Sequence, residues 1–196
     1  MNQEMVYNTE NLATYSATSE IKKYTPYELT KETSSILREN IKDFDFSDPE
    51  LDPIEISSRL IETIKLYKGA YSLAANQCGL PYNVFVAGSG EEFVAFFNPE
   101  IIVESPATSI MAESDLSNMG LSLHIKRPSS VTIGYQDYTG EQKIIQFDGL
   151  TSRIVQQNID RLNGIDFKDK VSKFVLDRSK KALNKKIKRF FKGGIN

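Results

Sequence analysis

The chain has 196 residues, of which 40% are hydrophobic and 26% are charged, and its formal net charge is −2. These values are typical of a globular domain and exclude coiled-coil, collagen-like and disulfide-scaffold classes. The single cysteine cannot form an internal disulfide, which favours a reducing, cytoplasmic location. No apolar run approaches the roughly 18 residues needed to span a bilayer, and the polar N-terminus predicts no secretory signal.

Three regions are predicted: an N-terminal arm over 1–24, a domain over 25–168, and a basic amphipathic helix with its tail over 169–196. Hydrophobic periodicity and turn signals predict the elements of the domain. In chain order these are a helical turn or two within 28–43, a helix over 54–68, strands over 82–88, 92–99, 100–105, 131–138 and 143–149, and helices over 151–162 and 169–191. Tyr138–Glu141 predicts a hairpin turn. Strands flanked by segregated helices indicate an α+β fold.

Charge is unevenly distributed along the chain. Residues 168–196 hold eleven lysines and arginines and two aspartates, a local charge of +9, whereas residues 1–167 carry −11. The predicted last helix can pack on its own domain, or bind an acidic protein, a membrane surface or nucleic acid. The acidic body argues against nucleic acid. We expect other protein subunits of a complex as partners, with no membrane span. The predicted partner-binding residues are Lys181, Lys185, Lys188, Arg189 and Phe190.

Three segments carry a family resemblance. They are AYSLAANQCG at 70–79, NMGLS at 118–122 and QQNIDRLNG at 156–164. In this order they resemble the GxGLAAxQ, EGCLS and QHExDHLxG signatures of peptide deformylases, and FFNPEI at 96–101 fits between them. The resemblance covers residues 25–178. It implies a deformylase-like mixed or antiparallel sheet around a central helix, followed by the C-terminal basic helix.

The resemblance also implies a chemistry that this sequence does not carry. Deformylases hydrolyse the N-formyl group of nascent peptides with a divalent metal held by a cysteine and two histidines, and a glutamate moves the proton. Those positions are Gly120, Gln157, Arg161 and, for the glutamate, Asn158. A bound metal lowers the pKa of water from 15.7 to about 7. We therefore predict no metal, no cofactor and no catalytic residue, with Gln157 and Arg161 hydrogen-bonding across the former metal position.

Other positions of the resemblance are kept. Gln77 matches the family side chain that contacts the formyl oxygen, and Leu121 matches the residue whose backbone N–H also contacts that oxygen. Both are therefore predicted to form a remnant of the substrate pocket. Alternatively, Gln77 only supports its loop. Arg127 and Asp160 are predicted as a structural pair. Cys78 is expected to be a packed thiol. His124 is expected on the surface or in a loop, with a remnant binding role as the alternative.

From the missing ligands we expect the chain not to be an enzyme. It is predicted to be a catalytically inactive deformylase-like protein that serves as a structural or assembly subunit, such as a tail or baseplate component of a phage virion. Two alternatives stay open. One is a pseudoenzyme that binds N-terminal formyl-peptides, and the other is a residual peptide deformylase that hydrolyses N-formyl-methionyl peptides. The expected location is the cytoplasm, or a virion after assembly.

Overall fold

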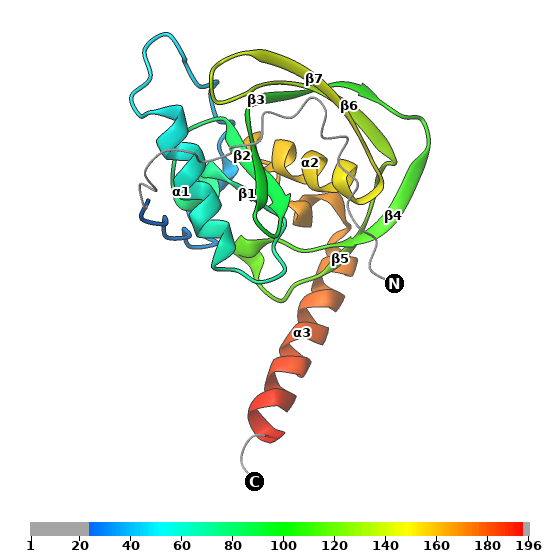
Figure 1. Cartoon of the computed structure of the whole chain (residues 1–196). Coiled ribbons are helices and arrows are strands. Elements are labelled where there is room, and N and C mark those ends of the chain that lie inside the picture. Colours follow the sequence, from blue (N-terminus) through cyan, green and yellow to red (C-terminus); the bar gives the residue numbers. More distant parts are fainter. Residues whose placement is uncertain (1–23, 194–196) are drawn as a thin grey trace.

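The computed structural model describes residues 24–193, so the N-terminal arm predicted over 1–24 lies, apart from Tyr24, outside the described residues. The helices are α1 (Pro53–Lys65), α2 (Gly149–Leu162) and α3 (Lys173–Gly193), and the strands are β1 (Ser72–Ala74), β2 (Val84–Ser89), β3 (Glu92–Glu104), β4 (Thr108–Glu113), β5 (Leu123–Pro128), β6 (Ser130–Gln136) and β7 (Gln142–Asp148). Within the described residues, seven strands follow α1 in the chain and build a curved sheet and a separate strand pair, and α2 and α3 come after them (Figure 1).

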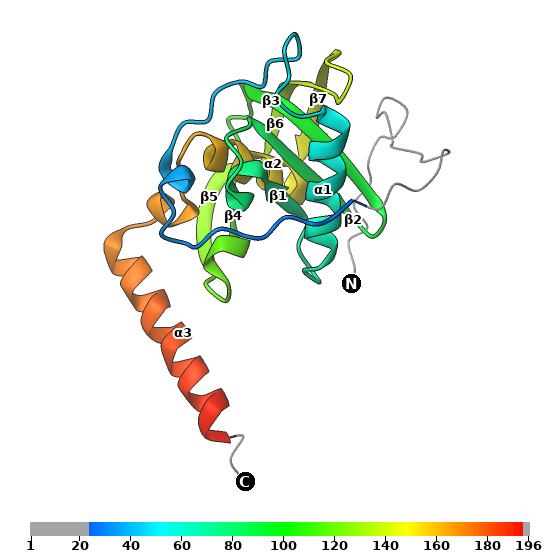
Figure 2. The same cartoon turned by 90° about the vertical axis from the view of Figure 1, so that its left-hand side faces the viewer.

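The larger sheet has five strands in the order β1-β2-β3-β6-β7, and all of its neighbours are antiparallel. Strands β4 and β5 form a separate antiparallel pair. The register of β3 against β6 shifts between Phe97 and Glu100 and again between Ile101 and Val103. Such bulges bend a strand and increase its twist. The sheet therefore curves around α2, which lies inside it in both views (Figures 1 and 2).

One face of the large sheet packs against α2. Val155, Ile159 and Leu162 line one side of this helix and are at most 6% exposed. They contact strand residues that point to the same face, namely Phe85, Phe96, Val131, Ile133, Tyr135 and Phe147. Ring stacking of Phe85 on Phe96, with centroids 4.7 Å apart, adds to this contact. The apolar side of α2 thereby holds the helix against the sheet, and the polar side of α2 is turned away from this core.

The opposite face of the sheet packs against α1. Its buried side chains Ile56, Leu60 and Ile64 recur at helical spacing. They lie against Leu73, Val84, Val86, Phe93 and Phe97. The helix begins where Asp52 accepts a hydrogen bond from the Ile54 N–H at 2.8 Å and Pro53 occupies the first helical position.

The fold class predicted from the sequence, α+β with a sheet around a central helix, is confirmed. Two details differ. The strands expected over 92–99 and 100–105 are one long strand, β3, because bulges let it bend without a break. Strands β1, β4 and β5 were not among the predicted elements. Strand β1 has only three residues, and β4 and β5 pair with each other in a separate sheet, so their strand conformation depends on that pairing.

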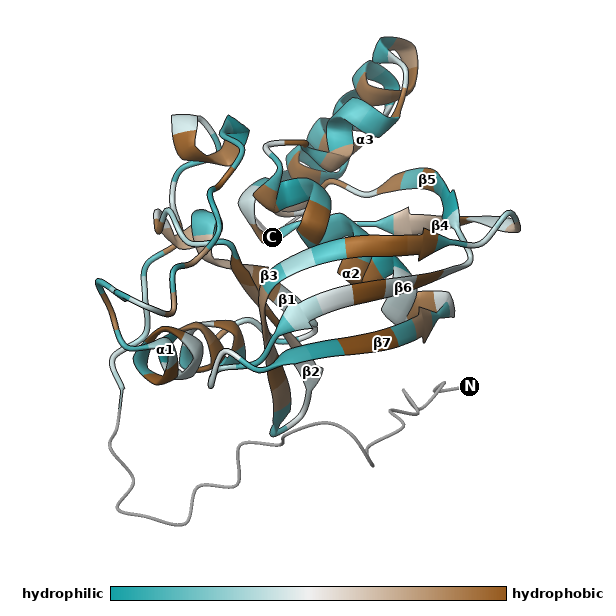
Figure 3. Cartoon of the chain, turned by 90° about the horizontal axis from the view of Figure 1, so that it is seen from above, coloured by the Kyte–Doolittle hydropathy of each residue, from teal (hydrophilic) through white to brown (hydrophobic). Residues whose placement is uncertain are grey.

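The last helix begins later than expected, at Lys173, because a 3₁₀ turn over Phe167–Lys170 precedes it. Leu176 and Leu183 pack against a small cluster of Leu121, Leu123, Ile125 and Phe167. Beyond Leu183 the helix extends away from the body (Figure 2). Hydrophobic and hydrophilic residues alternate along it (Figure 3). No helix among the described residues is long and apolar enough to cross a membrane.

Candidate functional site

A cavity of about 370 Å³ lies beside the polar side of α2. This volume is in the range of small-ligand pockets. Its walls come from β1 and the segment before it, from the segment that joins β4 to β5, and from α2. The lining includes Lys68, Ser72, Gln77, Glu113, Asp115, Met119, Gly120, Arg153, Gln157, Asn158 and Arg161. The four positions at which the family resemblance implies metal ligands and the catalytic glutamate therefore line one cavity together with Gln77. They are Gly120, Gln157, Asn158 and Arg161.

Gln77 lies in a 3₁₀ turn, Ala75–Cys78, that follows β1 directly. Its Oε1 accepts a hydrogen bond from the Ala74 N–H at 3.0 Å. Its Nε2 donates to Ser117 Oγ at 3.1 Å and lies 3.4 Å from Asp115 Oδ1. The side chain is 4% exposed, so these contacts fix it in the wall of the cavity. Gln77 thus supports its loop and also presents an amide donor at the cavity.

Leu121, the second predicted pocket residue, has its N–H engaged within the chain. It donates to the Asn118 carbonyl at 3.1 Å. The Leu121 side chain is 5% exposed and belongs to the cluster beneath α3. Leu121 therefore connects the cavity segment to the packing of α3.

Two amides on α2 face the cavity walls. Gln157 Nε2 donates to the Ser114 carbonyl at 2.9 Å. Asn158 Nδ2 donates to Ser72 Oγ and to the Ile154 carbonyl, both at 2.7 Å. Gln157 and Arg161 were predicted to hydrogen-bond across the former metal position, and each reaches a different partner on the opposite wall, Ser114 for Gln157 and Asp115 for Arg161. Asn158 connects α2 to β1 and has no group that titrates.

Arg161, one turn after Gln157, is 2% exposed. Its guanidinium donates to Asp115 Oδ2 at 2.9 Å and to Asp166 Oδ2 at 3.3 Å. Burial by itself would lower the pKa of Arg161, but the charges of Asp115 and Asp166 outweigh it and hold the pKa above its ordinary value. The side chain is therefore a fixed cation beside the cavity.

Asp166 completes this ion pair from the turn before α3. Burial alone would raise the pKa of its carboxyl. The Lys168 N–H and the charges of Arg161, Lys168 and Arg38 oppose burial and hold that pKa below its ordinary value. The Asp166 carboxylate is thus charged near neutral pH, and the Arg161 guanidinium lies between it and the carboxylate of Asp115.

The residues at this site do not fit the divalent metal that the family resemblance implies. Zinc and iron sites take thiolate, imidazole or carboxylate ligands. Here the three ligand positions hold a glycine, a carboxamide and a buried guanidinium. Within residues 24–193 no three histidine, cysteine, aspartate or glutamate side chains are grouped so that they could hold a metal ion.

Gly120 also has a backbone that disfavours a side chain. Its φ is +83°, in the left-handed region that favours glycine. A Cβ placed there would lie 3.2 Å from Leu183 Cδ1 of α3. A cysteine at this position would therefore strain the backbone and press on the last helix.

A second charged cluster adjoins the cavity, and two of its members, Glu113 and Arg153, line it. Glu113, with a side chain 1% exposed, accepts from Arg127 Nε at 2.6 Å and from Arg127 Nη2 at 2.9 Å. Arg153 Nη1 donates to the same carboxylate. The predicted pair is also present, with Arg127 Nη1 2.6 Å from Asp160 Oδ2. The cluster joins β4, β5 and α2 at the cavity wall.

Sequence reasoning missed four residues of these clusters: Glu113, Asp115, Arg153 and Asp166. Each ion pair joins segments distant in sequence, such as Arg161 with Asp115 or Arg153 with Glu113. No local pattern marks such a pair. One signal was available, because Arg161 on a predicted apolar-sided helix needs a buried anion as partner.

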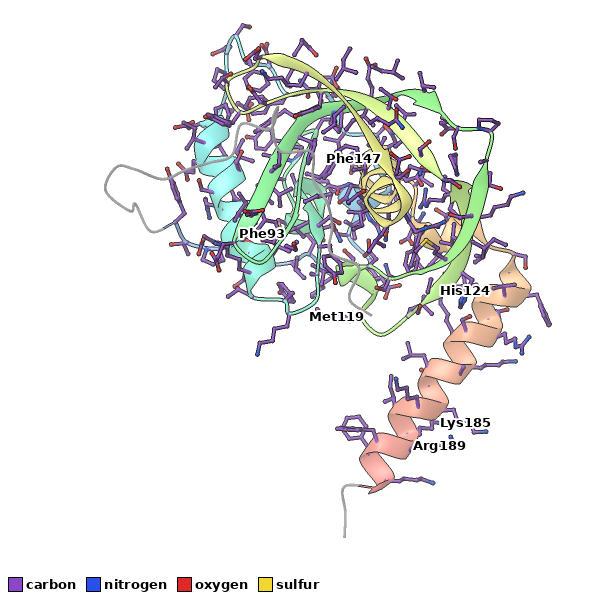
Figure 4. All side chains as sticks on the ribbon, turned by 45° about the vertical axis from the view of Figure 1, so that its right-hand side comes forward. Phe93, Met119, His124, Phe147, Lys185 and Arg189 are labelled. Carbon is purple, nitrogen blue, oxygen red and sulfur yellow. The ribbon has the colours of Figure 1, made fainter. Side chains whose placement is uncertain are left out.

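His124, labelled in Figure 4, is exposed on β5 and is not among the residues that line the cavity beside α2. Cys78 packs beside the α1 cluster. Burial raises the pKa of its thiol from an ordinary value of 9.0 to about 12. These two residues are therefore placed apart from the chemistry of the cavity.

The raised pKa of Cys78 predicts slow alkylation. At pH 8 the native thiolate is about 10³-fold scarcer than in the unfolded chain, because the pKa difference is about three units. We expect iodoacetamide to modify Cys78 at least about 10³-fold more slowly in native protein than in urea, followed by mass spectrometry. Equal rates in the two states would contradict the burial of this thiol.

The predicted partner-binding residues lie on the distal part of α3. Lys181, Lys185, Lys188 and Arg189 lie together on one face with Asn184 and Lys192, and Figure 4 shows Lys185 and Arg189 pointing away from the body. Phe190 is 80% exposed and shares the other side with Leu183 and Ile187 by its spacing. The proximal half of the helix packs on its own domain. Partner binding by the distal half stays a prediction.

Comparison with known proteins gives one family. Residues 26–176 match the family model described as polypeptide deformylase. The chain is 34% identical over 155 residues to a peptide deformylase of Agrobacterium fabrum, an alignment that covers 76% of this chain and 89% of that protein. It is 36% identical over 123 residues to a peptide deformylase of Prochlorococcus marinus, which covers 60% of each chain.

Solved structures agree with the sequence relatives. The crystal structure of peptide deformylase from Thermotoga maritima superposes with a TM-score of 0.71 at 30% identity, over 76% of this chain and 99% of that one. A plant peptide deformylase superposes with a TM-score of 0.73 at 27% identity, over 89% and 96% of the two chains. The fold is therefore that of a deformylase-type domain. The chain belongs to the peptide deformylase family.

These relatives correct the functional prediction. The expectation of a non-enzyme that serves as a structural subunit or a phage virion component is wrong, since the matching proteins are named as deformylases, which are enzymes. The error had a physical origin. Four missing side chains were taken to decide the function, although the chain has the fold of the family and carries Gln77 at the position that the sequence resemblance assigns to it.

Proposed function

We propose that the chain acts on N-formyl-methionyl peptides as a peptide deformylase, releasing formate and a free amino terminus. The observation that carries the proposal is the cavity beside Gln77, which lies at the polar side of the central helix in this chain of the family. In this reaction a water oxygen bonds to the formyl carbon, the C–N bond breaks, and the amine nitrogen takes a proton.

The cavity supplies binding and polarisation of the formyl group. Gln77 Nε2 is an amide donor at the cavity wall, and its present acceptors lie at 3.1 and 3.4 Å. A formyl oxygen at this wall would compete with them for the two amide hydrogens. A donor aimed at the oxygen where negative charge develops stabilises the transition state. Gln77 is the residue that we assign to this role.

Proton transfer from water requires a base. Glu113 and Asp115 both line the cavity, but Glu113 is bound by two guanidinium groups, those of Arg127 and Arg153. Among the described residues, Asp115 is bound by one guanidinium, that of Arg161, and turns Oδ1 toward Gln77. Its other oxygen is held by Arg161, which fixes the carboxylate. We assign Asp115 as the carboxylate that accepts the proton, a role generally worth 10²–10⁴-fold in rate. No step is assigned to a metal, because the residues present do not fit one.

The test is formate release from formyl-Met-Ala-Ser by wild-type protein and by Gln77→Met. We expect the wild type to release formate and Gln77→Met to lose about 10²–10³-fold in kcat/KM, as when one oxyanion donor is removed. Gln142→Met, at an exposed position of β7, is the matched control and should keep the wild-type rate.

Two outcomes would reject the proposal. The first is peptide binding without any formate release by the wild type above the buffer rate. The second is an equal loss of kcat/KM in Gln77→Met and Gln142→Met. Thermal unfolding of both variants is measured in parallel to show that they are folded.

A further inference from the structure

We propose that the Arg161 guanidinium, held between Asp115 and Asp166, takes the place of a divalent ion in this family fold. It would supply both the fixed positive charge of the cavity and the connection between α2 and the segment that joins β4 to β5. The site would then form and bind its peptide without metal. The peptide part of this statement rests on the proposed function, whereas the structural part does not.

Residues 157 and 161 of α2 contact the β4–β5 segment directly. The family resemblance implies a metal whose ligands come from α2, at 157 and 161, and from residue 120 in the β4–β5 segment. In this chain the side chains at the same two helical positions reach that segment directly. Gln157 donates to the Ser114 carbonyl at 2.9 Å, and Arg161 pairs with Asp115 at 2.9 Å. Direct contacts thus join the two elements that a metal would otherwise join.

The charges around Arg161 are balanced within the protein. The side chains of Arg161, Asp115 and Asp166 are at most 5% exposed. Buried charges persist only when they are paired and hydrogen-bonded. The cluster meets this condition, because Ser117 N–H also donates to Asp115 Oδ1 at 2.8 Å and Lys168 Nζ lies 3.4 Å from Asp166 Oδ2. A divalent cation placed here would be repelled by a guanidinium that cannot lose its proton.

Hydrogen bonds through Asp115 and Asn76 connect Arg161 to Gln77. Asp115 contacts Arg161 with one carboxylate oxygen and approaches Gln77 Nε2 with the other. Asn76, the residue before Gln77, donates from Nδ2 to the Arg161 carbonyl at 2.8 Å. Arg161 therefore positions the turn that carries Gln77 through both its side chain and its backbone. It is a positioning residue rather than one that touches the formyl group.

The experiment compares the full chain with Arg161→Gln, Arg161→Lys and Arg178→Gln. The last removes an exposed arginine of α3 by the same substitution. Elemental analysis of the purified wild type should find less than about 0.1 metal ion per chain, and EDTA should leave its Tm unchanged. Arg161→Gln should lower Tm by roughly 10 °C, because it leaves buried carboxylates without their partner. Arg178→Gln should not lower it, and Arg161→Lys should lie between.

A stoichiometric metal ion in the wild type, a fall of Tm with EDTA, or equal Tm values for Arg161→Gln and Arg178→Gln would overturn the proposal. If Arg161→Gln is insoluble, the Tm of Arg161→Lys and the effect of EDTA on the wild-type Tm still test the proposal. The peptide part is tested by calorimetry with formyl-Met-Ala-Ser, whose Kd should change less than twofold with EDTA. Absence of any peptide binding, with metal-free and EDTA-insensitive protein, would reject the proposed function and leave the structural inference standing.

Discussion

Replacement of Glu113 by glutamine is expected to lower the free energy of unfolding by about 3–5 kcal/mol, because it leaves two buried guanidinium groups without their anion. The carboxylate is 1% exposed and pairs with Arg127 and Arg153, whose side chains are 5% and 3% exposed. Solvent screens such a cluster little. Urea unfolding followed by circular dichroism measures the change.

The matched control for this prediction is Glu104→Gln, at the exposed end of β3. It should change the free energy of unfolding by less than about 0.5 kcal/mol. Equal effects of the two substitutions would show that the Glu113 cluster does not stabilise the fold. A double variant with Arg153→Met should lose less than the two single losses added, since the second change removes one of the unpaired charges.

The largest expected effect on activity comes from restoring the family's metal chemistry. The variant carries Gly120→Cys, Gln157→His, Asn158→Glu and Arg161→His. With added zinc or iron it should bind about one ion per chain, and its kcat/KM for formyl-Met-Ala-Ser should rise at least about 10³-fold, since a metal-bound water and a glutamate both act on the proton. The added activity should be lost with EDTA.

The backbone at Gly120 opposes this restoration and makes the prediction more specific. A side chain at φ +83° costs about 1–2 kcal/mol, and the new Cβ would press on Leu183. Adding Leu183→Ala should therefore improve metal binding by the restored variant. Gly120→Cys, Gln157→His and Asn158→Glu with Arg161 retained is the control, and it should bind no ion. Equal metal binding by the control would contradict the role of the guanidinium.

The family fold could be predicted from the sequence because its signals are local. The apolar positions of α1 and α2 follow a helical period, the Asn163–Gly164 pair ends α2 with Gly164 at φ +75°, and Gly140 lies in the turn of the β6–β7 hairpin. Short or bent strands escaped this reasoning. The residues of β1, β4 and β5 gain their strand conformation from pairing with partners, which no sequence window contains.

The candidate site also has a part that could be predicted from the sequence and a part that could not. The sequence by itself determined which groups stand at the positions of the family motifs, namely Gln77, Gly120, Gln157, Asn158 and Arg161. Only the tertiary structure decided that Arg161 lies between Asp115 and Asp166 and that Glu113 lies between Arg127 and Arg153. The physical reason is that a buried charge takes its partner from whatever segment the fold brings near, so its environment depends on three-dimensional packing and not on sequence spacing.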